Sequence, residues 1–110
     1  ARIASARSAA FDRRVFTPAE LRYARRHADA AERLAGRFAA KEAVLKALGT
    51  GWAKGISWRE VETVNDRAGR PVLRLKGRAA KRARSLGIAR WHLSIAHAGG
   101  NALATAVAEG

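Results

Sequence analysis

Glu42 and Lys46 are the residues whose types and spacing most directly suggest chemistry. They are four residues apart, so on a helix a carboxylate and an ammonium lie on one face. An exposed pair of this kind contributes only about 0.3–0.5 kcal/mol. Arg37 and Lys41 fall in the same stretch, and a carboxylate among cations is what a site for magnesium and a diphosphate requires. Spacing alone leaves both interpretations open, an exposed helix pair and a metal–diphosphate site.

His97 is a second candidate, because it ends a predicted strand just before Gly99 and Gly100. A side chain at a strand end is exposed while the sheet holds its surroundings, and an imidazole there can donate to a phosphate. The other interpretation is a solvated loop histidine.

Three tryptophans, Trp52, Trp58 and Trp91, could stack on bases if the chain bound RNA. Core packing is the other interpretation. It is favoured for Trp91, which shares a strand face with Leu93 and Ile95.

The charge of the chain predicts an anionic partner. The 22 Lys and Arg residues against 9 Asp and Glu give a formal charge of +13 and a pI of about 11.7. A nucleic acid, an anionic membrane surface, or an acidic protein together with a phosphate-rich small molecule would fit. An Arg-rich, Ala-rich composition can also reflect genome base composition, which weakens the argument from charge.

Two absences narrow the function. The sequence has no cysteine, so disulfides, thiolate nucleophiles and Cys-based metal sites are excluded. It has no apolar run of about 18 residues, so we expect no membrane span and a cytoplasmic protein.

The first half of the sequence predicts helices. Residues 2–11 are helix-prone, and Thr17-Pro-Ala-Glu20 forms a capping-box pattern before a short helix that reaches about His27. A long helix is predicted over 31–48, ended by the glycines of 49–51. Its apolar residues along one side are Leu34, Phe38, Leu45 and Leu48.

The second half changes to a period of two. Residues 56–64 and 72–76 predict a hairpin, and 77–86 predict a helix with a basic face. Strands are expected over 91–96 and 103–107, the latter with Leu103, Thr105 and Val107 facing one way. The order predicts an α+β domain with helices packed on an antiparallel sheet.

Two segments resemble the motifs of a known family. Leu34–Gly51 resembles the hallmark helix of the holo-(acyl-carrier-protein) synthases, which are 4'-phosphopantetheinyl transferases, and Trp91–His97 resembles their second motif. Phe16–Leu21 and Gly69–Leu73 are similar to the linking segments, so the resemblance covers nearly the whole chain. Ala96 stands where the family usually carries a hydroxyl residue.

The resemblance implies transfer of the 4'-phosphopantetheine arm of coenzyme A, the substrate, to a serine of an apo acyl carrier protein in fatty acid or polyketide biosynthesis. It implies dependence on Mg²⁺, with Mn²⁺ as the alternative. Glu42 would be the metal ligand and, with Lys46, catalytic. The implied coenzyme A-binding residues are Arg37, Lys46, Ser94 and His97. The implied residues for an acidic carrier protein are Arg2, Arg7 and Arg14.

The resemblance also implies a homotrimer with active sites between subunits, where Glu42 and His97 meet across two chains. An apolar interface would suit a small core that is poor in aromatics. We expect residues 1–110 to form a single phosphopantetheinyl transferase domain that lacks the family's first strand, which carries a Gly-x-Asp metal ligand.

Two alternatives belong to other classes. One is a basic nucleic-acid-binding module that uses the helix predicted over 77–86, and the other is an inactive relative that only binds carrier proteins. The basic residues of that helix are Arg78, Lys81, Arg82 and Arg84.

Overall fold

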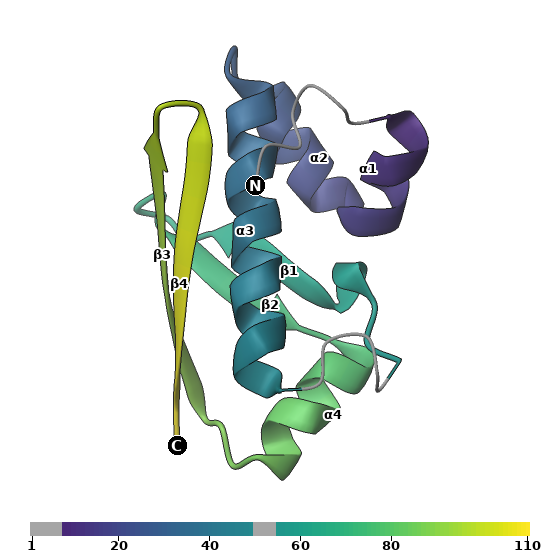
Figure 1. Ribbon diagram of the computed structural model, residues 1–110, viewed down its shortest axis with the longest axis vertical. Helices are drawn as coiled ribbons and strands as arrows, with labels where there is room; N and C mark the ends of the chain where they lie inside the picture. Colours follow the sequence, from purple (N-terminus) through teal and green to yellow (C-terminus); the bar gives the residue numbers. More distant parts are fainter. Residues whose placement is uncertain (1–7, 50–54) are drawn as a thin grey trace.

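The computed structural model describes residues 8–49 and 55–110, in which helices come first and antiparallel hairpins follow (Figure 1). The predicted α+β class is confirmed. In chain order the elements are α1 (Ala9–Val15), α2 (Pro18–Arg25), α3 (Ala30–Leu48), the 3-10 helix η2 (Trp58–Glu60), β1 (Val61–Asn65), β2 (Pro71–Leu75), α4 (Gly77–Ser85), β3 (Arg90–Ala98) and β4 (Asn101–Glu109).

Helix α3 runs through the centre of the molecule. The β3–β4 hairpin lies along one side of it, the β1–β2 hairpin lies behind it, and α1 and α2 cover the remaining side (Figure 1). Each hairpin is an antiparallel ladder, with Val61 opposite Leu75 in one and Arg90 opposite Glu109 in the other. The helix therefore presents different faces to different layers.

The start of the chain differs from the prediction. The helix expected over 2–11 begins at Ala9 and ends at Val15, because Ser8 is its N-cap and accepts a hydrogen bond from the Phe11 amide at 3.1 Å. Residues 2–7 lie outside the described residues. The capping box before α2 is confirmed, since Thr17 and Glu20 each accept from the other's amide, at 3.2 and 3.0 Å.

The long helix is confirmed almost residue for residue. Its four predicted apolar side chains are buried, and it ends at Gly49, whose φ of 73° suits only glycine well. The C-terminal half packs with Ile56, Val61 and α4, and the N-terminal half packs with α1 and α2. Trp58 and Trp91 pack against this core, as expected for Trp91, whereas Trp52 lies outside the described residues.

A buried ion pair fixes α3 to its neighbours. Lys41 Nζ lies 2.9 Å from Glu20 Oε1 and donates to the carbonyls of Trp58 and Val61 at 3.0 and 2.6 Å. The other Glu20 oxygen accepts from the Thr63 amide at 2.8 Å. These contacts satisfy all three ammonium protons and join α2, α3 and β1.

The second half differs in two places. The strand expected from Ile56 begins only at Val61, because η2 occupies the residues just before it. The last hairpin turns only at Gly99 and Gly100, whose φ values are 56° and 79°, so His97 lies inside β3 and pairs with Ala102. His97 is consequently held by a strand and is not a loop residue.

The outer face of the β3–β4 hairpin exposes two large apolar side chains, with the polar Ser94 and Thr105 between them. Leu103 is 71% exposed and Val107 is 51% exposed, on the face that the alternation predicted. Within the part of the chain that the structure describes, no helix is long and apolar enough to cross a bilayer.

Candidate active site

Arg37 and His97, which are far apart in sequence, border the same pocket of about 200 Å³. Its walls come from α2, α3, the β1–β2 hairpin and β3. The side chains that line it include no carboxylate among the described residues, although two are arginines. They are Tyr23, Arg33, Gly36, Arg37, Asn65, Gly69, Pro71, Ile95 and His97.

Arg37 is buried, with only 4% of its surface exposed. Its Nη2 donates to Asn65 Oδ1 at 2.6 Å, and its guanidinium lies 3.9 Å from the centroid of the Tyr23 ring. Its Nε is buried with no hydrogen-bond partner among the described residues. Burial lowers the pKa of Arg37, and this outweighs the opposing effects of Tyr23 and Glu20, while the charge of nearby Arg33 lowers the pKa further. An anion in the pocket would offset this poorly compensated charge.

Behind Arg37 lies a second set of contacts. Arg33 Nη1 donates to the Tyr23 hydroxyl at 2.8 Å, and Arg33 Nε lies 3.1 Å from Asp29 Oδ1. The hydrogen bond to Asp29 raises the pKa of Arg33, so this guanidinium stays charged. The Tyr23 ring is therefore held between two arginines of α3.

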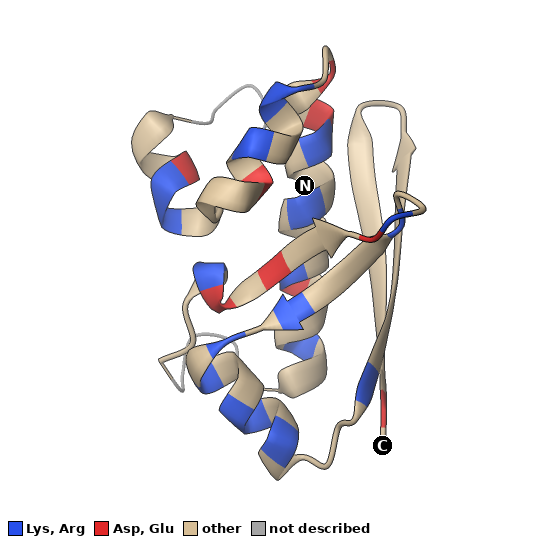
Figure 2. Cartoon of the chain, turned by 180° about the vertical axis from the view of Figure 1, so that it is seen from behind, with Lys and Arg blue, Asp and Glu red and all other residues tan. Residues whose placement is uncertain are grey.

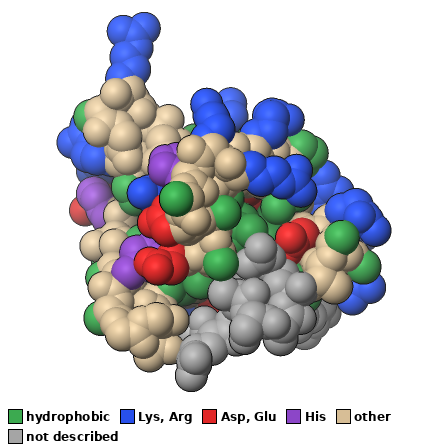
Figure 3. Space-filling model, turned by 90° about the horizontal axis from the view of Figure 1, so that it is seen from above, with side chains coloured by type: hydrophobic (Ala, Val, Ile, Leu, Met, Phe, Trp, Pro, Cys, Tyr) green, Lys and Arg blue, Asp and Glu red, His purple; other side chains and the backbone are tan. Residues whose placement is uncertain are grey.

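His97 packs against α3 where the helix has no side chain. A Cβ atom at Gly36 would lie 2.9 Å from Ile95 Cγ2 and 3.0 Å from His97 Cε1. His97 also borders a second hollow of about 230 Å³, which Glu32 and Asn101 line as well. Figure 3 views this end of the molecule and shows histidine side chains among basic and acidic ones.

The structure does not bring the other predicted residues to this pocket. Glu42 is half-buried and Lys46 is exposed on α3, and neither lines the pocket. At about 100° per residue they lie roughly 140° and 180° around the helix axis from Arg37. Ser94 is exposed on β3, three residues from His97, so the two side chains point to opposite faces of the strand.

Lys41 is a correction to the sequence argument. The spacing grouped it with Arg37 and Lys46 as a cation for a diphosphate, whereas its side chain is fully buried and paired with Glu20. Burial lowers its pKa, and the attraction of Glu20 opposes that shift. Lys41 is therefore part of the core of the fold.

Glu42 is the one carboxylate among the predicted site residues, and it lies outside this pocket. Among residues 8–49 and 55–110, no three His, Asp or Glu side chains gather closely enough to hold a metal. Glu42 alone still fits Mg²⁺, which commonly keeps several waters and is bound by one or two carboxylates together with substrate phosphates.

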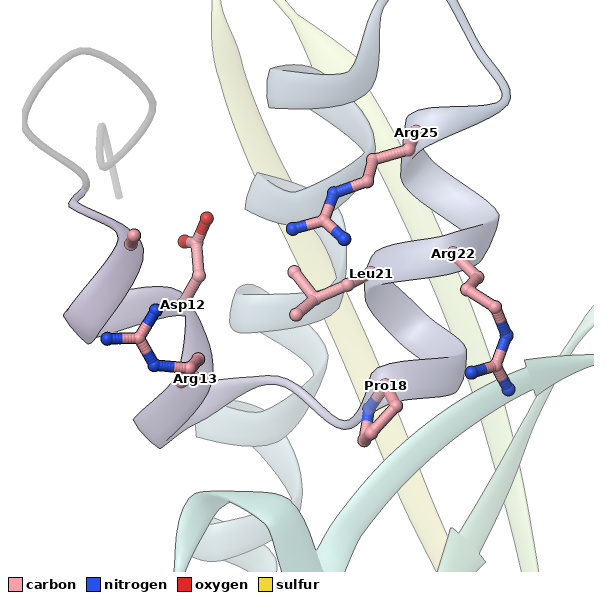
Figure 4. A pocket seen from close by; sticks show the side chains of 7 residues that line it. Asp12, Arg13, Pro18, Leu21, Arg22 and Arg25 are labelled. Carbon is pink, nitrogen blue, oxygen red and sulfur yellow. The ribbon is translucent and has the colours of Figure 1, made fainter.

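The helices α1 and α2 carry a basic surface of their own. Arg14 is exposed in the last turn of α1, whereas Arg2 and Arg7 lie outside the described residues. A pocket of about 320 Å³ opens between the two helices, with Leu21 and Pro18 among the arginines (Figure 4). The arginines that line it are Arg13, Arg22 and Arg25.

The cations are not confined to α4. Figure 2 shows Lys and Arg on α1, α2, α3, β2 and α4. In α4, Arg78, Lys81 and Arg84 are exposed, whereas Arg82 donates from Nε to the Leu48 carbonyl at 3.1 Å and so caps the end of α3.

Sequence reasoning missed Tyr23, Arg33, Gly36 and Asn65. The chain has a single tyrosine, which was one available signal, and a glycine inside a predicted helix was another. Asn65 was interpreted only as turn chemistry. Their contacts depend on how α2, α3 and β1 pack, which spacing along one element does not show.

Comparison with known proteins places the chain in a family. A sequence model of the 4'-phosphopantetheinyl transferase superfamily matches residues 1–107. The chain therefore belongs to this superfamily. Within it, the chain is an enzyme of the holo-[acyl-carrier-protein] synthase type.

Its relatives support that assignment. The holo-[acyl-carrier-protein] synthase of Koribacter versatilis is 46% identical over 96 residues, which cover 87% of this chain and 77% of the relative. That of Frankia alni is 52% identical over 96 residues, which cover 87% and 75%.

Solved structures agree in fold. The holo-[acyl-carrier-protein] synthase of Neisseria meningitidis superimposes with a TM-score of 0.85 at 35% identity, over 99% of this chain and 87% of that one. That of Helicobacter pylori in complex with coenzyme A gives 0.78 at 28% identity, over 91% and 82%.

Proposed function

We propose that the chain, in the cytoplasm, transfers the 4'-phosphopantetheine group of coenzyme A to a serine of an apo acyl carrier protein in fatty acid or polyketide biosynthesis. The observation that carries this proposal is the pocket that the buried Arg37 and the exposed His97 both line, with no carboxylate among its described lining residues. Coenzyme A supplies phosphates for such a pocket, and the Helicobacter pylori relative is found in complex with it.

In the proposed reaction the serine oxygen attacks the phosphorus that bears the pantetheine arm. A new O–P bond forms, the bond from that phosphorus to the bridging oxygen breaks, and adenosine 3',5'-bisphosphate leaves. Lys46 lies against the diphosphate and offsets its growing negative charge. Glu42 accepts the serine proton through a water molecule. Arg37 and His97 hold coenzyme A through its phosphates.

Mg²⁺, or Mn²⁺ in its place, would be held by Glu42 and the substrate phosphates. It would supply charge stabilisation at the oxygens of the diphosphate. Glu42 is half-buried, which supports this role: a metal ligand must be reachable from solvent, and its side chain must be held in place by the surrounding protein.

We propose a homotrimer with its active sites between subunits. Arg37 and Glu42 lie on different sides of α3, so within one chain the proposed coenzyme A-binding group and the proposed metal ligand point in different directions. The uncovered Leu103 and Val107 offer an apolar surface for a second copy. In this arrangement each active site combines Arg37 and His97 of one subunit with residues of a neighbouring subunit. The neighbour contributes Glu42, Lys46 and Ser94.

The carrier protein is proposed to dock on α1 and α2. Arg14 belongs to that surface, and Arg2 and Arg7 are proposed to extend it. Pro18 and Leu21 line the pocket between the helices together with three arginines and Asp12, and its net positive charge suits an acidic segment with one apolar side chain (Figure 4).

Mass spectrometry of an apo carrier protein tests the proposal, using the full-length protein with coenzyme A and Mg²⁺. The expected result is a gain of one phosphopantetheine arm that Glu42→Ala abolishes and Glu109→Ala, which removes an exposed carboxylate elsewhere, retains. Carrier binding without any mass gain would identify an inactive relative. RNA retention that falls steeply with salt, without a mass gain, would identify the nucleic-acid-binding alternative.

A further inference from the structure

We propose that Tyr23 is a positioning residue for coenzyme A, acting through the guanidinium of Arg37. The inference rests on the proposed function, because it takes Arg37 as a coenzyme A-binding group. Tyr23 lies on α2, outside the two motifs that resemble the family, and the proposed reaction gives it no role.

Tyr23 supports one face of the Arg37 guanidinium. The distance from Arg37 Cζ to the ring centroid is 3.9 Å, which is short enough for a strong cation–π contact. Asn65 holds one edge of the same group through the 2.6 Å hydrogen bond from Nη2. The long and flexible side chain of Arg37 is thereby fixed in one orientation before any ligand binds, which lowers the entropic cost of binding.

The ring is itself fixed from its other end. Its hydroxyl accepts from Arg33, whose Nε is paired with Asp29. On the α2 side, the ring of His27 lies 4.8 Å from the tyrosine ring, and its Nδ1 is 2.9 Å from the Tyr23 carbonyl. Tyr23 thus transmits the position of α2 and of the first turn of α3 to Arg37.

The charges around Tyr23 favour an anion. Arg33 and Arg37 are four residues apart on α3 and both line the pocket, and like charges at that spacing repel. Asp29 compensates Arg33, whereas the direct partners of Arg37 among the described residues are a neutral amide and the ring. The ring face attracts Arg37 without neutralising it, so the positive charge remains available to a phosphate.

Three substitutions separate positioning from general stability. Tyr23→Leu removes the ring, and Tyr23→Phe keeps the ring but removes the acceptor for Arg33. Phe16→Leu is the matched control, because it removes a buried aromatic ring from the same helical layer, away from the pocket. Each variant is measured for the dissociation constant of coenzyme A by calorimetry, for KM and kcat, and for its melting temperature.

We expect Tyr23→Leu to raise the dissociation constant and the KM for coenzyme A about tenfold while kcat at saturation is retained. Tyr23→Phe should stay within about threefold of the wild type. Phe16→Leu should lower the melting temperature without changing the affinity for coenzyme A. Should Tyr23→Leu fail to fold, Tyr23→Met gives a longer and more flexible apolar side chain for the same measurements.

The outcomes separate this inference from the function on which it rests. If Tyr23→Leu binds coenzyme A as tightly as the wild type does, the positioning role is overturned and the proposed function still stands. An equal fall of kcat and affinity in Tyr23→Leu and Phe16→Leu would also overturn it, because both would then reflect lost packing. Wild-type protein that fails to bind coenzyme A would overturn the proposed function itself.

Discussion

The ammonium nitrogen of Lys41 lies 2.9 Å from Oε1 of Glu20, and neither side chain is exposed to solvent. The pair links the N-terminal turn of α2 to the middle of α3, one residue before Glu42. A buried pair of this kind is costly to break from one side, because the remaining charge has no partner.

Lys41→Met should lower the free energy of unfolding by about 3–5 kcal/mol, since it leaves Glu20 buried without its cation. Urea unfolding followed by circular dichroism measures the change. Lys81→Met removes an exposed lysine and should stay within about 0.5 kcal/mol of the wild type. A double variant, Lys41→Met with Glu20→Gln, should recover part of the loss; equal stability of the two lysine variants would contradict the role of the pair.

The ionisation of Glu62 should make the free energy of unfolding depend on pH in the acid range. Burial acts to raise its pKa, but hydrogen bonds from Thr17 and Lys76 outweigh burial and hold that pKa below its ordinary value of 4.5. The unfolded chain then takes up a proton at a higher pH than the folded one, so this contribution is present above about pH 4.5 and is lost as pH falls through the lower folded-state pKa. Unfolding titrations from about pH 6 to about pH 2 should show a shallower loss of stability for Glu62→Gln than for the wild type.

Gly36→Ala should push β3 away from α3. An added Cβ would lie 2.9 Å from Ile95 Cγ2, so we expect a loss of about 1–3 kcal/mol in the free energy of unfolding, although alanine is the better helix former. The KM for coenzyme A should rise as well, because His97 moves with its strand. Ile95→Ala in the same chain should restore part of the stability; a Gly36→Ala variant more stable than the wild type would rule out the close contact.

Leu103→Glu should dissociate the proposed homotrimer and remove activity. The side chain is 71% exposed in a single chain, and a carboxylate there would be buried without a partner in an interface. Light scattering coupled to gel filtration reports the mass. Leu86→Glu, at a site that is 45% exposed on another part of the surface, should keep both assembly and activity. A monomeric wild-type protein with full activity would refute the interfacial site.

Two inactive variants should rescue each other. If Glu42 and His97 act from different subunits, mixing Glu42→Ala with His97→Ala chains in equal amounts produces some sites with both residues intact. Random assembly makes that share roughly one quarter of all sites. The carrier-modification assay, run after the chains have been unfolded and refolded together, measures it. Zero recovery in verified mixed trimers would place both residues in one chain.

Local patterns were enough to predict α2, α3 and α4. The capping box at Thr17 and Glu20, the apolar side of α3 and the glycine at its end are all written within one turn or one element. The first helix was placed too early, because residues 2–11 are helix-prone throughout and the stronger signal was the Ser8 cap.

The site depended on contacts between elements. Lys41 looked like a phosphate-binding cation because spacing reports only its neighbours on α3, whereas its partners Glu20 and Val61 are 21 and 20 residues away. Tyr23 and Asn65 reach Arg37 only after α2 and the β1–β2 hairpin pack on α3. Family resemblance predicted Arg37 and His97 as site residues, and the fold brings both to the lining of one pocket.

Helix α3 presents Arg37 to the pocket that His97 also lines, whereas Glu42 and Lys46 lie on the other side of the helix. Under the proposed assembly, a single chain therefore carries parts of two different active sites and completes neither. Activity would then depend on protein concentration more steeply than in direct proportion, since dilution below the dissociation constant of the assembly removes sites as well as molecules.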